Sequence, residues 1–547
     1  MSYISEIQVP PTGPDDTQIL IIGEAPGEAE EVLGKPFVGT AGDILWGALS
    51  QIPISRSEVT VTNLCNYRPA NNNFQYLIDS KELTDGIKDI LSYIELNKNL
   101  KLVLLLGDKP LHYLLGKNGI SKWRGSAIKK NGIIYLPCYH PAYIARVGND
   151  YPIFASDIAK IPKLLKDGIT TPKFSTLIDP RGLQLKEAVD EIISWPEATT
   201  DIESVMDSTH ILCVGFGYRD RSICIVNHSI DAGDFEYGQA IHSILGSSVK
   251  KIFQGGIFDT LMLEENGYFT ENYYWDTLIG AHVLDPELPL SLAHLTSMYT
   301  DIPYFKDMGK SAIPENEKSW NKAVKRNLLY EYNCLDTLAD YKVYEYQKKE
   351  IEADEDYLRT FNFEMSMLPM LRHLAQSGML IDQERRAKIR QFLVRKIKDD
   401  QLILNSIFGM DVNANSKKMQ DKIYGEMGLP MKKKKTGQTT LDEDAIISLI
   451  GAVKSKLNEC KTEASQFEWM KKLGALTMTL SIRGNRKLLS SYIDPVISLD
   501  GRIRSTYHIG PETGRLSSSK YVDGTGNNGQ TWPRKVLDYE KTETKQV

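Results

Sequence analysis

The chain has 547 residues, of which 41% are hydrophobic and 25% are charged. At roughly 100 to 200 residues per domain, this length predicts about three to five domains and excludes a single small module. The 65 basic and 71 acidic residues give a net charge of −6. The chain as a whole therefore does not attract polyanions, and any affinity for DNA must come from local basic faces.

No targeting signal is visible in the sequence. The first residues, MSYISEIQVPPTGPDD, contain no basic stretch followed by an apolar one, and no later window approaches 18 uninterrupted apolar residues. We therefore expect a cytoplasmic protein with no membrane partner. Six cysteines lie far apart without CxxC spacing, which is typical of free thiols in a reducing cytosol. They are Cys65, Cys138, Cys213, Cys224, Cys334 and Cys460.

Residues 18–165 contain four short apolar runs that alternate with longer mixed stretches. The runs are QILIIG, VTVTN, LKLVLLLG and GIIYLPCY, and each ends in a polar or glycine-rich turn. This alternation predicts an open, mostly parallel α/β sheet. Ligands of such sheets bind beyond the carboxyl ends of the strands, so we expect Glu24, Asn63 and His140 to converge there.

Four motifs in this region resemble the uracil-DNA glycosylase superfamily, and most closely its iron–sulfur branch. In chain order they are GEAPGEAEEVLGKPFVGTAGDIL, VTNLCNYRP, LLLGDKPLHYLLG and CYHPAYIAR. The resemblance implies that Glu24 lies in the water-activating motif and that Phe37 stacks on a flipped base. It also implies that Asn63 reads the polar edge of the base and that His140 stabilises the leaving uracil anion. Such chemistry requires an extruded nucleotide, an aromatic face and donors aimed at the oxygen that gains charge.

The region departs from that family at its cluster ligands. No cysteine precedes Gly23, and Tyr67 stands where the family has a cysteine ahead of its Arg-Pro. We therefore expect no iron–sulfur cluster. Because the four pocket residues are present and the cluster ligands are absent, uracil excision and uracil recognition without excision both stay open, as does a DNA-docking role alone.

Residues 196–350 predict an α+β block. Three strand-like runs, TTDIES, HILCVGFGYR and SICIVNH, are expected to pair antiparallel, and KKIFQGG and helical segments follow them. Asp201 and Glu203 are two residues apart on the first run, so both side chains point to the same face. Asp336 follows Tyr332 by four residues in a helical segment, which places these two on one helix face.

Together with Asp259, these acids form a set of four carboxylates. They would repel one another unless divalent cations neutralise them, and oxygen-only sites favour two Mg²⁺ or Mn²⁺ ions. The motifs DIE, IFD and YxxxD resemble the DEDDy 3′–5′ proofreading exonucleases, which have an RNase H-like fold. The resemblance implies that Asp201, Glu203, Asp259 and Asp336 bind the metals and that the Tyr332 hydroxyl orients the attacking water.

Two further features bear on this exonuclease resemblance. The stretch WDTLIGAHVLDPELPLSLAHL resembles the one that family-A DNA polymerases carry between their second and third exonuclease motifs. Gly255 stands where these exonucleases usually have an asparagine that contacts the strand. We expect this departure to weaken the grip on the primer and to leave the chemistry in place.

After residue 352 the pattern is mostly helical, and it resembles the thumb of family-A DNA polymerases. The basic run Lys432, Lys433, Lys434 and Lys435 falls in the thumb tip, where the resemblance implies contact with duplex phosphates. Further on, TGRLSS resembles a polymerase motif in which Arg515 would hold the primer–template backbone.

The chain ends 14 residues beyond Pro533. Family-A polymerases place their palm carboxylates and their fingers helix after this point. Asp538 and Glu543 resemble the palm's DYxxxE pattern only superficially, and we interpret them as a coincidence. Because a two-metal transfer needs both palm carboxylates, we expect no polymerisation from this chain alone.

The combined interpretation is a multidomain α/β chain with three domains. We expect a glycosylase-like domain at residues 1–170, an exonuclease domain at 171–352 and a thumb with the start of a palm at 353–547. This order resembles family-A polymerases of large lytic phages, which implies the cytoplasm of a bacterial host. From the abrupt end after the thumb we expect a split or intron-interrupted gene, or a truncation. Its DNA partners would be single-stranded 3′ ends and primer–template duplexes.

Two alternatives stay open. The first is a DNA-docking subunit of a split polymerase, whose palm and fingers belong to a separate polypeptide. The second is a stand-alone repair enzyme that combines uracil excision with end trimming.

Overall fold

The computed structural model describes residues 3–170, 172–205, 207–228, 235–311, 326–434 and 437–532. The chain divides into two compact units. The first contains Met1–Leu371 and His508–Ser517, and the second contains Arg372–Tyr507 and Ser518–Val547. The division into three domains stays a prediction.

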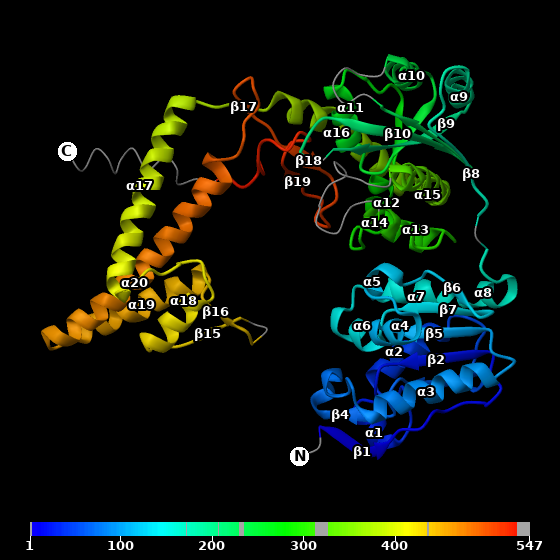
Figure 1. The fold of residues 1–547 in the computed structure, drawn as a ribbon, viewed down its shortest axis with the longest axis horizontal. Helices are drawn as coiled ribbons and strands as arrows, with labels where there is room; N and C mark the ends of the chain where they lie inside the picture. The colour runs from blue at the N-terminus through cyan, green and yellow to red at the C-terminus, as the bar shows by residue number, and fades with distance from the viewer. Residues whose placement is uncertain are drawn as a thin grey trace. The chain divides into compact units, whose positions relative to one another are not determined.

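The first unit begins with an N-terminal part, residues 3–170, that is built on a five-stranded sheet with the order β3-β2-β5-β7-β6 (Figure 1). The strands are β2 (Ile19–Gly23), β3 (Val59–Asn63), β5 (Leu102–Leu106), β6 (Ile128–Lys130) and β7 (Ile133–Cys138). All neighbours pair parallel except β6 with β7. The sheet confirms the mostly parallel arrangement that the four apolar runs predict.

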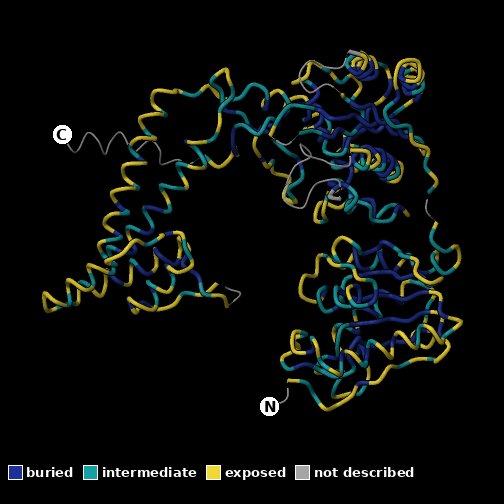
Figure 2. Tube along the Cα trace, in the orientation of Figure 1, coloured by how far each residue is buried: buried dark blue, intermediate teal, exposed yellow. Residues whose placement is uncertain are grey.

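Helices cover both faces of this sheet. Successive residues of each strand face opposite sides, and apolar residues point to both sides, so each face needs a covering layer. Ile19 and Ile21 belong to one apolar core, and Leu20 and Ile22 belong to the other. The helices are α1 (Glu28–Leu33), α2 (Thr40–Leu49), α3 (Lys81–Leu96), α4 (Asp108–Leu115), α5 (Ile120–Trp123), α6 (Pro141–Val147), α7 (Tyr151–Ala159) and α8 (Ile161–Asp167). Strands β1 (Ile4–Gln8) and β4 (Tyr67–Pro69) form a separate antiparallel pair. Figure 2 shows the central strands of the five-stranded sheet as buried.

The rest of the first unit, called the mixed-sheet part, contains a six-stranded sheet with the order β13-β12-β9-β10-β11-β8. Its strands are β8 (Ser175–Ile178), β9 (Glu197–Ser204), β10 (Ile211–Tyr218), β11 (Arg221–Val226), β12 (Lys250–Phe253) and β13 (Tyr273–Asp276). Strands β9, β10 and β11 pair antiparallel, as the sequence predicts, whereas β8, β12 and β13 join the sheet in parallel.

Helix α15 (Arg326–Glu352) packs across β9, β10 and β11. This close approach requires glycines on β10: a Cβ at Gly215 would lie 2.2 Å from Asn333 Oδ1, and one at Gly217 would lie 2.9 Å from Thr337 Cβ. The other helices are α9 (Leu183–Ile193), α10 (Phe235–Leu245), α11 (Ile257–Glu265), α12 (Thr277–Leu284), α13 (Leu292–Tyr299), α14 (Asp307–Ser311) and α16 (Glu355–Ser377). The glycines therefore let α15 bring its side chains onto the strand that carries the acidic motif.

A buried ion pair within the N-terminal part also makes a contact with the mixed-sheet part. Arg124 Nε and Nη2 donate to the two carboxylate oxygens of Asp157 at 2.7 and 2.5 Å. Arg124 is 2% exposed and Asp157 is fully buried. The third guanidinium nitrogen donates to Ser297 Oγ on α13 at 2.9 Å, and Lys160 donates to the Ser297 carbonyl. One buried cation thus holds both parts.

The second unit consists mainly of two long helices, α17 (Gln383–Phe408) and α20 (Glu463–Leu488), that pack along each other. At one end they carry α18 (Lys418–Asp421), α19 (Glu443–Glu459) and the hairpin of β15 (Lys432–Lys433) and β16 (Thr439–Thr440) (Figure 1). The remaining strands are β14 (Met379–Leu380), β17 (Arg502–Ile503), β18 (Thr506–His508) and β19 (Ser517–Ser519). His508 at the end of β18 and Ser517 at the start of β19 belong to the first unit.

Side-chain caps fix where these long helices begin. Asp382 accepts from Arg385 N at 2.9 Å at the start of α17, and Thr462 accepts from Ser465 N at 3.3 Å at the start of α20. The helical C-terminal region predicted from the sequence is confirmed. None of the described helices has the length and the apolar character that a membrane crossing requires.

We expect Asp157→Asn to lower the free energy of unfolding of the first unit by about 3–5 kcal/mol, because it leaves the Arg124 guanidinium buried without its anion. Urea titration followed by tryptophan fluorescence measures the change. Asp301→Asn is the matched control: Asp301 pairs with Lys163 at the same contact, but both side chains are about half exposed, so the expected cost is below about 1 kcal/mol. Equal costs for the two variants would contradict the assignment.

Candidate functional sites

The first candidate site lies at the carboxyl ends of β2 and β3. Gly23 ends β2 beside Asn63, which ends β3. A Cβ at Gly23 would lie 2.3 Å from Asn63 Oδ1 and 2.6 Å from Phe37 Cζ. Phe37 has a φ of 51°, and Glu30 and Trp46 hold its backbone N–H and carbonyl. The glycine therefore leaves the room in which the phenylalanine ring and the asparagine amide meet.

The Asn63 amide is buried and incompletely paired. The residue is 2% exposed, and its Nδ2 has no hydrogen-bond partner among the residues that the structure describes. An unpaired buried donor costs about 1–3 kcal/mol, so such groups are rare unless a ligand or water completes them. Asn63 therefore presents a donor that suits the acceptor oxygen of a bound molecule.

His140 is held in one tautomer by the helix that it caps. Its Nδ1 accepts from Ala142 N at 3.1 Å at the start of α6, so the proton of the neutral ring is on Nε2. Burial, with a smaller effect from the positive charge of Arg146, lowers the pKa of His140 to about 4. His140 is thus a neutral donor at ordinary pH, and its ring centroid lies 5.9 Å from that of Phe37.

Glu24 and His140 are brought together by Gly107. A Cβ at this glycine would lie 2.7 Å from Glu24 Oε1 and 3.2 Å from His140 Cβ, and its φ is 97°. Burial raises the pKa of Glu24, and the Lys109 backbone N–H and side-chain charge oppose that rise. Glu24 and His140 line a cleft of about 720 Å³. Phe37 and Asn63 are buried beside Gly23.

The cysteines of this part do not fit an iron–sulfur cluster, which takes four thiolate ligands. Residues 1–170 contain only Cys65 and Cys138. The two belong to different apolar cores, on opposite faces of the sheet. Burial raises the pKa of Cys65 to about 11 and that of Cys138 well above its ordinary value, which favours thiols over thiolates.

The second candidate site is a group of carboxylates in the mixed-sheet part, of which Glu203 and Asp336 are buried and Asp201 is half-buried. Asp201 and Glu203 on β9 and Asp336 on α15 each place a carboxylate oxygen within 4.8 Å of the others. Burial raises the pKa values of all three, and mutual repulsion raises those of Asp201 and Glu203 further. This set, called the acid cluster below, offers only oxygen ligands, which suits Mg²⁺ or Mn²⁺.

Asp259 and Tyr332 lie next to the acid cluster. Asp259 Oδ1 accepts from Ile202 N at 3.3 Å, between the two acidic residues of β9, and burial raises the pKa of Asp259 to about 7. Burial and the nearby acids raise the pKa of Tyr332, so its hydroxyl keeps its proton. The structure therefore gathers all five residues that the exonuclease resemblance implies.

Two contacts of the acid cluster come from residues that the sequence analysis missed. Asn333 Nδ2 donates to Asp201 Oδ2 at 2.8 Å, which fixes that carboxylate. Lys306 Nζ lies 2.5 Å from Asp336 Oδ1 and 3.0 Å from the Tyr332 hydroxyl. Asn333 directly follows Tyr332 and could have been noticed, whereas Lys306 lies in no motif.

The glycine at position 255 has a local explanation. Its φ is 68°, and its N–H donates to Asp276 Oδ1 at 2.9 Å. A side chain is strained in this left-handed conformation, which glycine adopts freely. Gly255 therefore suits the turn that precedes α11.

The basic residues predicted to contact DNA lie in two places. Lys432 and Lys433 form β15 and Lys434 follows them, so the run is part of the hairpin in the second unit, and Lys433 and Lys434 are exposed. Arg515 is exposed just after a turn in which Gly514 N donates to the Pro511 carbonyl at 2.9 Å. Lys435, Asp538 and Glu543 lie outside the described residues.

Comparisons with known proteins match different parts of the chain. The model of the uracil DNA glycosylase superfamily matches residues 10–159. The type-4 uracil-DNA glycosylase of Sulfurisphaera tokodaii is 34% identical over 182 residues, which make up 31% of this chain and 78% of that relative. DNA polymerase I of Bacillus subtilis is 28% identical over 175 residues, which make up 30% of this chain and 19% of that relative. The chain thus spans about a fifth of the polymerase relative.

A solved structure adds a weaker likeness. The POL domain of Pol1 from M. smegmatis, in complex with DNA primer-template and dNTP, has a TM-score of 0.45 and 17% sequence identity. The match covers 66% of this chain and 56% of that chain.

We expect the ring of His140 to titrate with a midpoint near pH 4, because burial disfavours its cationic form. NMR of the full chain with isotope-labelled histidine measures the midpoint, and the His140→Gln variant identifies the signal. A midpoint near 6.5, the ordinary value for histidine, would contradict the neutral-donor assignment.

Proposed function

The chain belongs to the uracil-DNA glycosylase superfamily through its N-terminal part, and we propose that this part recognises uracil extruded from a DNA strand. The observation that carries the proposal is the buried, unpartnered Nδ2 of Asn63 beside the Phe37 ring. A uracil carbonyl oxygen would accept from this nitrogen. The aromatic ring would supply part of the stacking that the base loses on leaving the duplex.

Excision would also require Glu24 and His140, which line the cleft. Cleavage of the glycosidic bond puts negative charge on the uracil, and the Nε2–H of neutral His140 is the donor that could stabilise it. Glu24 would orient the attacking water. Loss of one such donor costs about 10² to 10³ in rate, so a small displacement of His140 would leave binding intact and slow the cleavage. We therefore propose recognition as the first function and slow excision as the second.

We further propose that the mixed-sheet part is a metal-dependent 3′–5′ exonuclease. The acid cluster, with its three carboxylates within 4.8 Å, carries this proposal. Asp201, Glu203 and Asp336 would hold divalent ions, with Asp259 beside them, and Asn333 keeps Asp201 in place. Bound there, the ions would supply an activated water and stabilise the leaving 3′ oxygen. The protonated hydroxyl of Tyr332 would orient that water.

These sites belong to a DNA-processing protein that is also related to DNA polymerase I. That relation favours a role in replication, with the hairpin lysines and Arg515 contacting backbone phosphates. The glycosylase relation favours the alternative, a repair enzyme that combines uracil recognition with end trimming.

We expect the Asp201→Ala/Glu203→Ala double variant to lose nearly all Mg²⁺-dependent degradation of a labelled single strand, because the strand that holds the metals would keep neither carboxylate. A gel assay of product lengths measures the loss and shows whether degradation starts at the 3′ end. The control is Glu187→Ala/Asp190→Ala, which removes two exposed acids from α9 in the same part. Degradation by the first double variant at the parental rate would show that the site is misassigned.

We expect the full chain to bind uracil-containing single strands more tightly than thymine-containing ones, and Asn63→Ala to abolish the difference. The reason is that this amide is the donor that reads the base. Fluorescence anisotropy at fixed salt measures both affinities. The control is Asn99→Ala, which removes an exposed asparagine ahead of β5, at the amino end of that strand. Equal affinity of the parent chain for the two strands would reject base recognition.

A further inference from the structure

Lys306 is a cation inside the acid cluster. Its ammonium lies 2.5 Å from Asp336 Oδ1, donates to the Tyr332 hydroxyl at 3.0 Å and lies 4.9 Å from the centre of that ring. The side chain of Asp336 is 6% exposed and that of Lys306 is 20% exposed. Buried carboxylates need a positive partner or a proton, and Lys306 supplies the partner from within the chain.

The same carboxylate is one that a divalent ion would use. An ammonium and a divalent cation on one carboxylate repel each other, and that repulsion is strong where little water screens it. Metal binding at Asp336 therefore requires the Lys306 ammonium to move away or to share the oxygen at a cost. The position of one side chain thus bears on the metal affinity of the whole cluster.

The segment that carries Lys306 is bound to the N-terminal part. Tyr304 N donates to Ser126 Oγ at 3.1 Å, and the Tyr304 ring packs edge-on against Trp123 at 5.0 Å between centroids. On the other side of the lysine, Asp307 pairs with Lys122 at 3.8 Å. The residues on both sides of Lys306 are therefore held by contacts with the N-terminal part.

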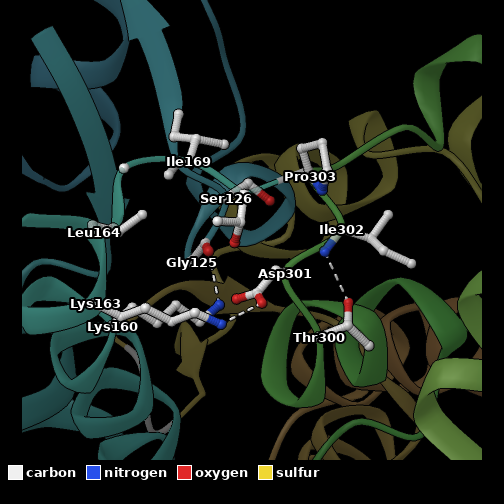
Figure 3. Close-up of a pocket in the computed structure, with 13 residues that line it drawn as sticks. Gly125, Ser126, Lys160, Lys163, Leu164, Ile169, Thr300, Asp301, Ile302 and Pro303 are labelled. Atoms are coloured by element: carbon white, nitrogen blue, oxygen red, sulfur yellow. Dashed lines mark hydrogen bonds and ion pairs between the residues drawn. The ribbon is translucent and has the colours of Figure 1, made fainter. Parts of the chain in front are cut away.

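The start of this segment is held in the same way (Figure 3). Lys163 pairs with Asp301 at 2.5 Å, and Lys160 donates to the Gly125 carbonyl at 2.8 Å and to a carbonyl of α13. Figure 3 shows Gly125 and Ser126 opposite residues 300–303 across a small cleft of about 40 Å³. That volume leaves little more than the space of a water molecule, so the two parts fit closely where the segment begins.

We infer that Lys306 is a resident counter-ion that competes with divalent cations for Asp336, and that the N-terminal part sets the position of this lysine. The inference rests on the proposed exonuclease and deepens it, because it makes the glycosylase-like part a determinant of metal affinity at the acid cluster. No bond is made or broken in this role. Lys306 is a positioning residue. Its replacement therefore changes the affinity of the acid cluster for metal, and the rate of degradation changes only as a consequence.

The first test is a Mn²⁺ titration of the full chain, followed by electron paramagnetic resonance, with Asp201→Asn defining which binding belongs to the acid cluster. Lys306→Met should tighten Mn²⁺ binding by about tenfold, because the repelling charge is gone. Lys306→Arg should keep the parental affinity. Lys349→Met is the matched control, since Lys349 is 83% exposed on α15 and pairs only with Glu350 among the contacts that the structure records.

A second variant pair tests the role of the N-terminal part. Trp123→Ala and Ser126→Ala loosen the segment without touching the acid cluster, and each should also tighten Mn²⁺ binding, by a smaller factor than Lys306→Met. Tyr93→Ala is the control, because it removes an aromatic side chain of the same part that hydrogen-bonds the Pro14 carbonyl instead. Circular dichroism confirms that each variant is folded, and Lys306→Gln replaces Lys306→Met if the latter is not.

The outcomes separate the inference from the proposed function. If the parent chain binds Mn²⁺ at the acid cluster and degrades DNA, but neither neutral variant of Lys306 binds Mn²⁺ more tightly, the inference is wrong and the exonuclease stands. A lower turnover at saturating Mn²⁺ with unchanged affinity would likewise overturn it, because Lys306 would then act on the reaction. If Asp201→Asn removes no Mn²⁺ binding from the parent chain, both the exonuclease and the inference fail.

Discussion

The bidentate ion pair between Arg124 and Asp157 is the interaction on which the first unit depends. A fully buried carboxylate needs a partner of fixed geometry, and the planar guanidinium supplies two parallel hydrogen bonds. The remaining guanidinium nitrogen reaches Ser297 on α13, so the same cation that neutralises Asp157 ties the N-terminal part to the mixed-sheet part. The segment that follows α13 leads to Lys306. A buried pair in one part thereby fixes the start of the segment that enters the acid cluster of the other.

Close packing at glycines positions the groups in both candidate sites. Gly23 leaves room for Asn63 and Phe37, Gly107 leaves room for Glu24 and His140, and Gly215 leaves room for Asn333. A Cβ at any of the three would lie 2.7 Å or less from one of these side chains, which is shorter than an ordinary contact. Two of these glycines lie at the end of a strand and one lies inside β10. In each site, therefore, the absence of a Cβ at a glycine leaves the space that the functional side chains occupy.

The sequence predicted what depends on local pattern. Apolar runs gave the parallel strands, period-two spacing placed Asp201 and Glu203 on one face, and the four-residue spacing placed Tyr332 and Asp336 on one helix face. Lys306 could not be found in this way, because 30 residues separate it from Asp336 and only the folded segment brings the two together. The unpaired amide of Asn63 was equally out of reach, because whether a buried group finds a partner depends on every neighbour around it.

The tautomer of His140 was also beyond the sequence, since it follows from the hydrogen bond of Ala142 N to Nδ1 at the start of α6. A lone histidine before a proline shows neither its cap geometry nor its burial. For Phe37, the motif position indicated a stacking residue. Its burial beside Gly23 could not be predicted, because it comes from a left-handed backbone conformation that Glu30 and Trp46 hold.

Burial acts on the two sites in opposite ways. At His140 it removes the positive charge, and the neutral ring that remains is the form that can donate from Nε2 to a developing anion. At the acid cluster it disfavours the negative charges, yet carboxylates bind metals only when ionised. Low polarity alone prepares the first site. The carboxylates of the second site stay ionised only when positive charge neutralises them, either from a bound ion or from Lys306. The proposed uracil site therefore needs no cation, and the proposed exonuclease site depends on which cation the acid cluster holds.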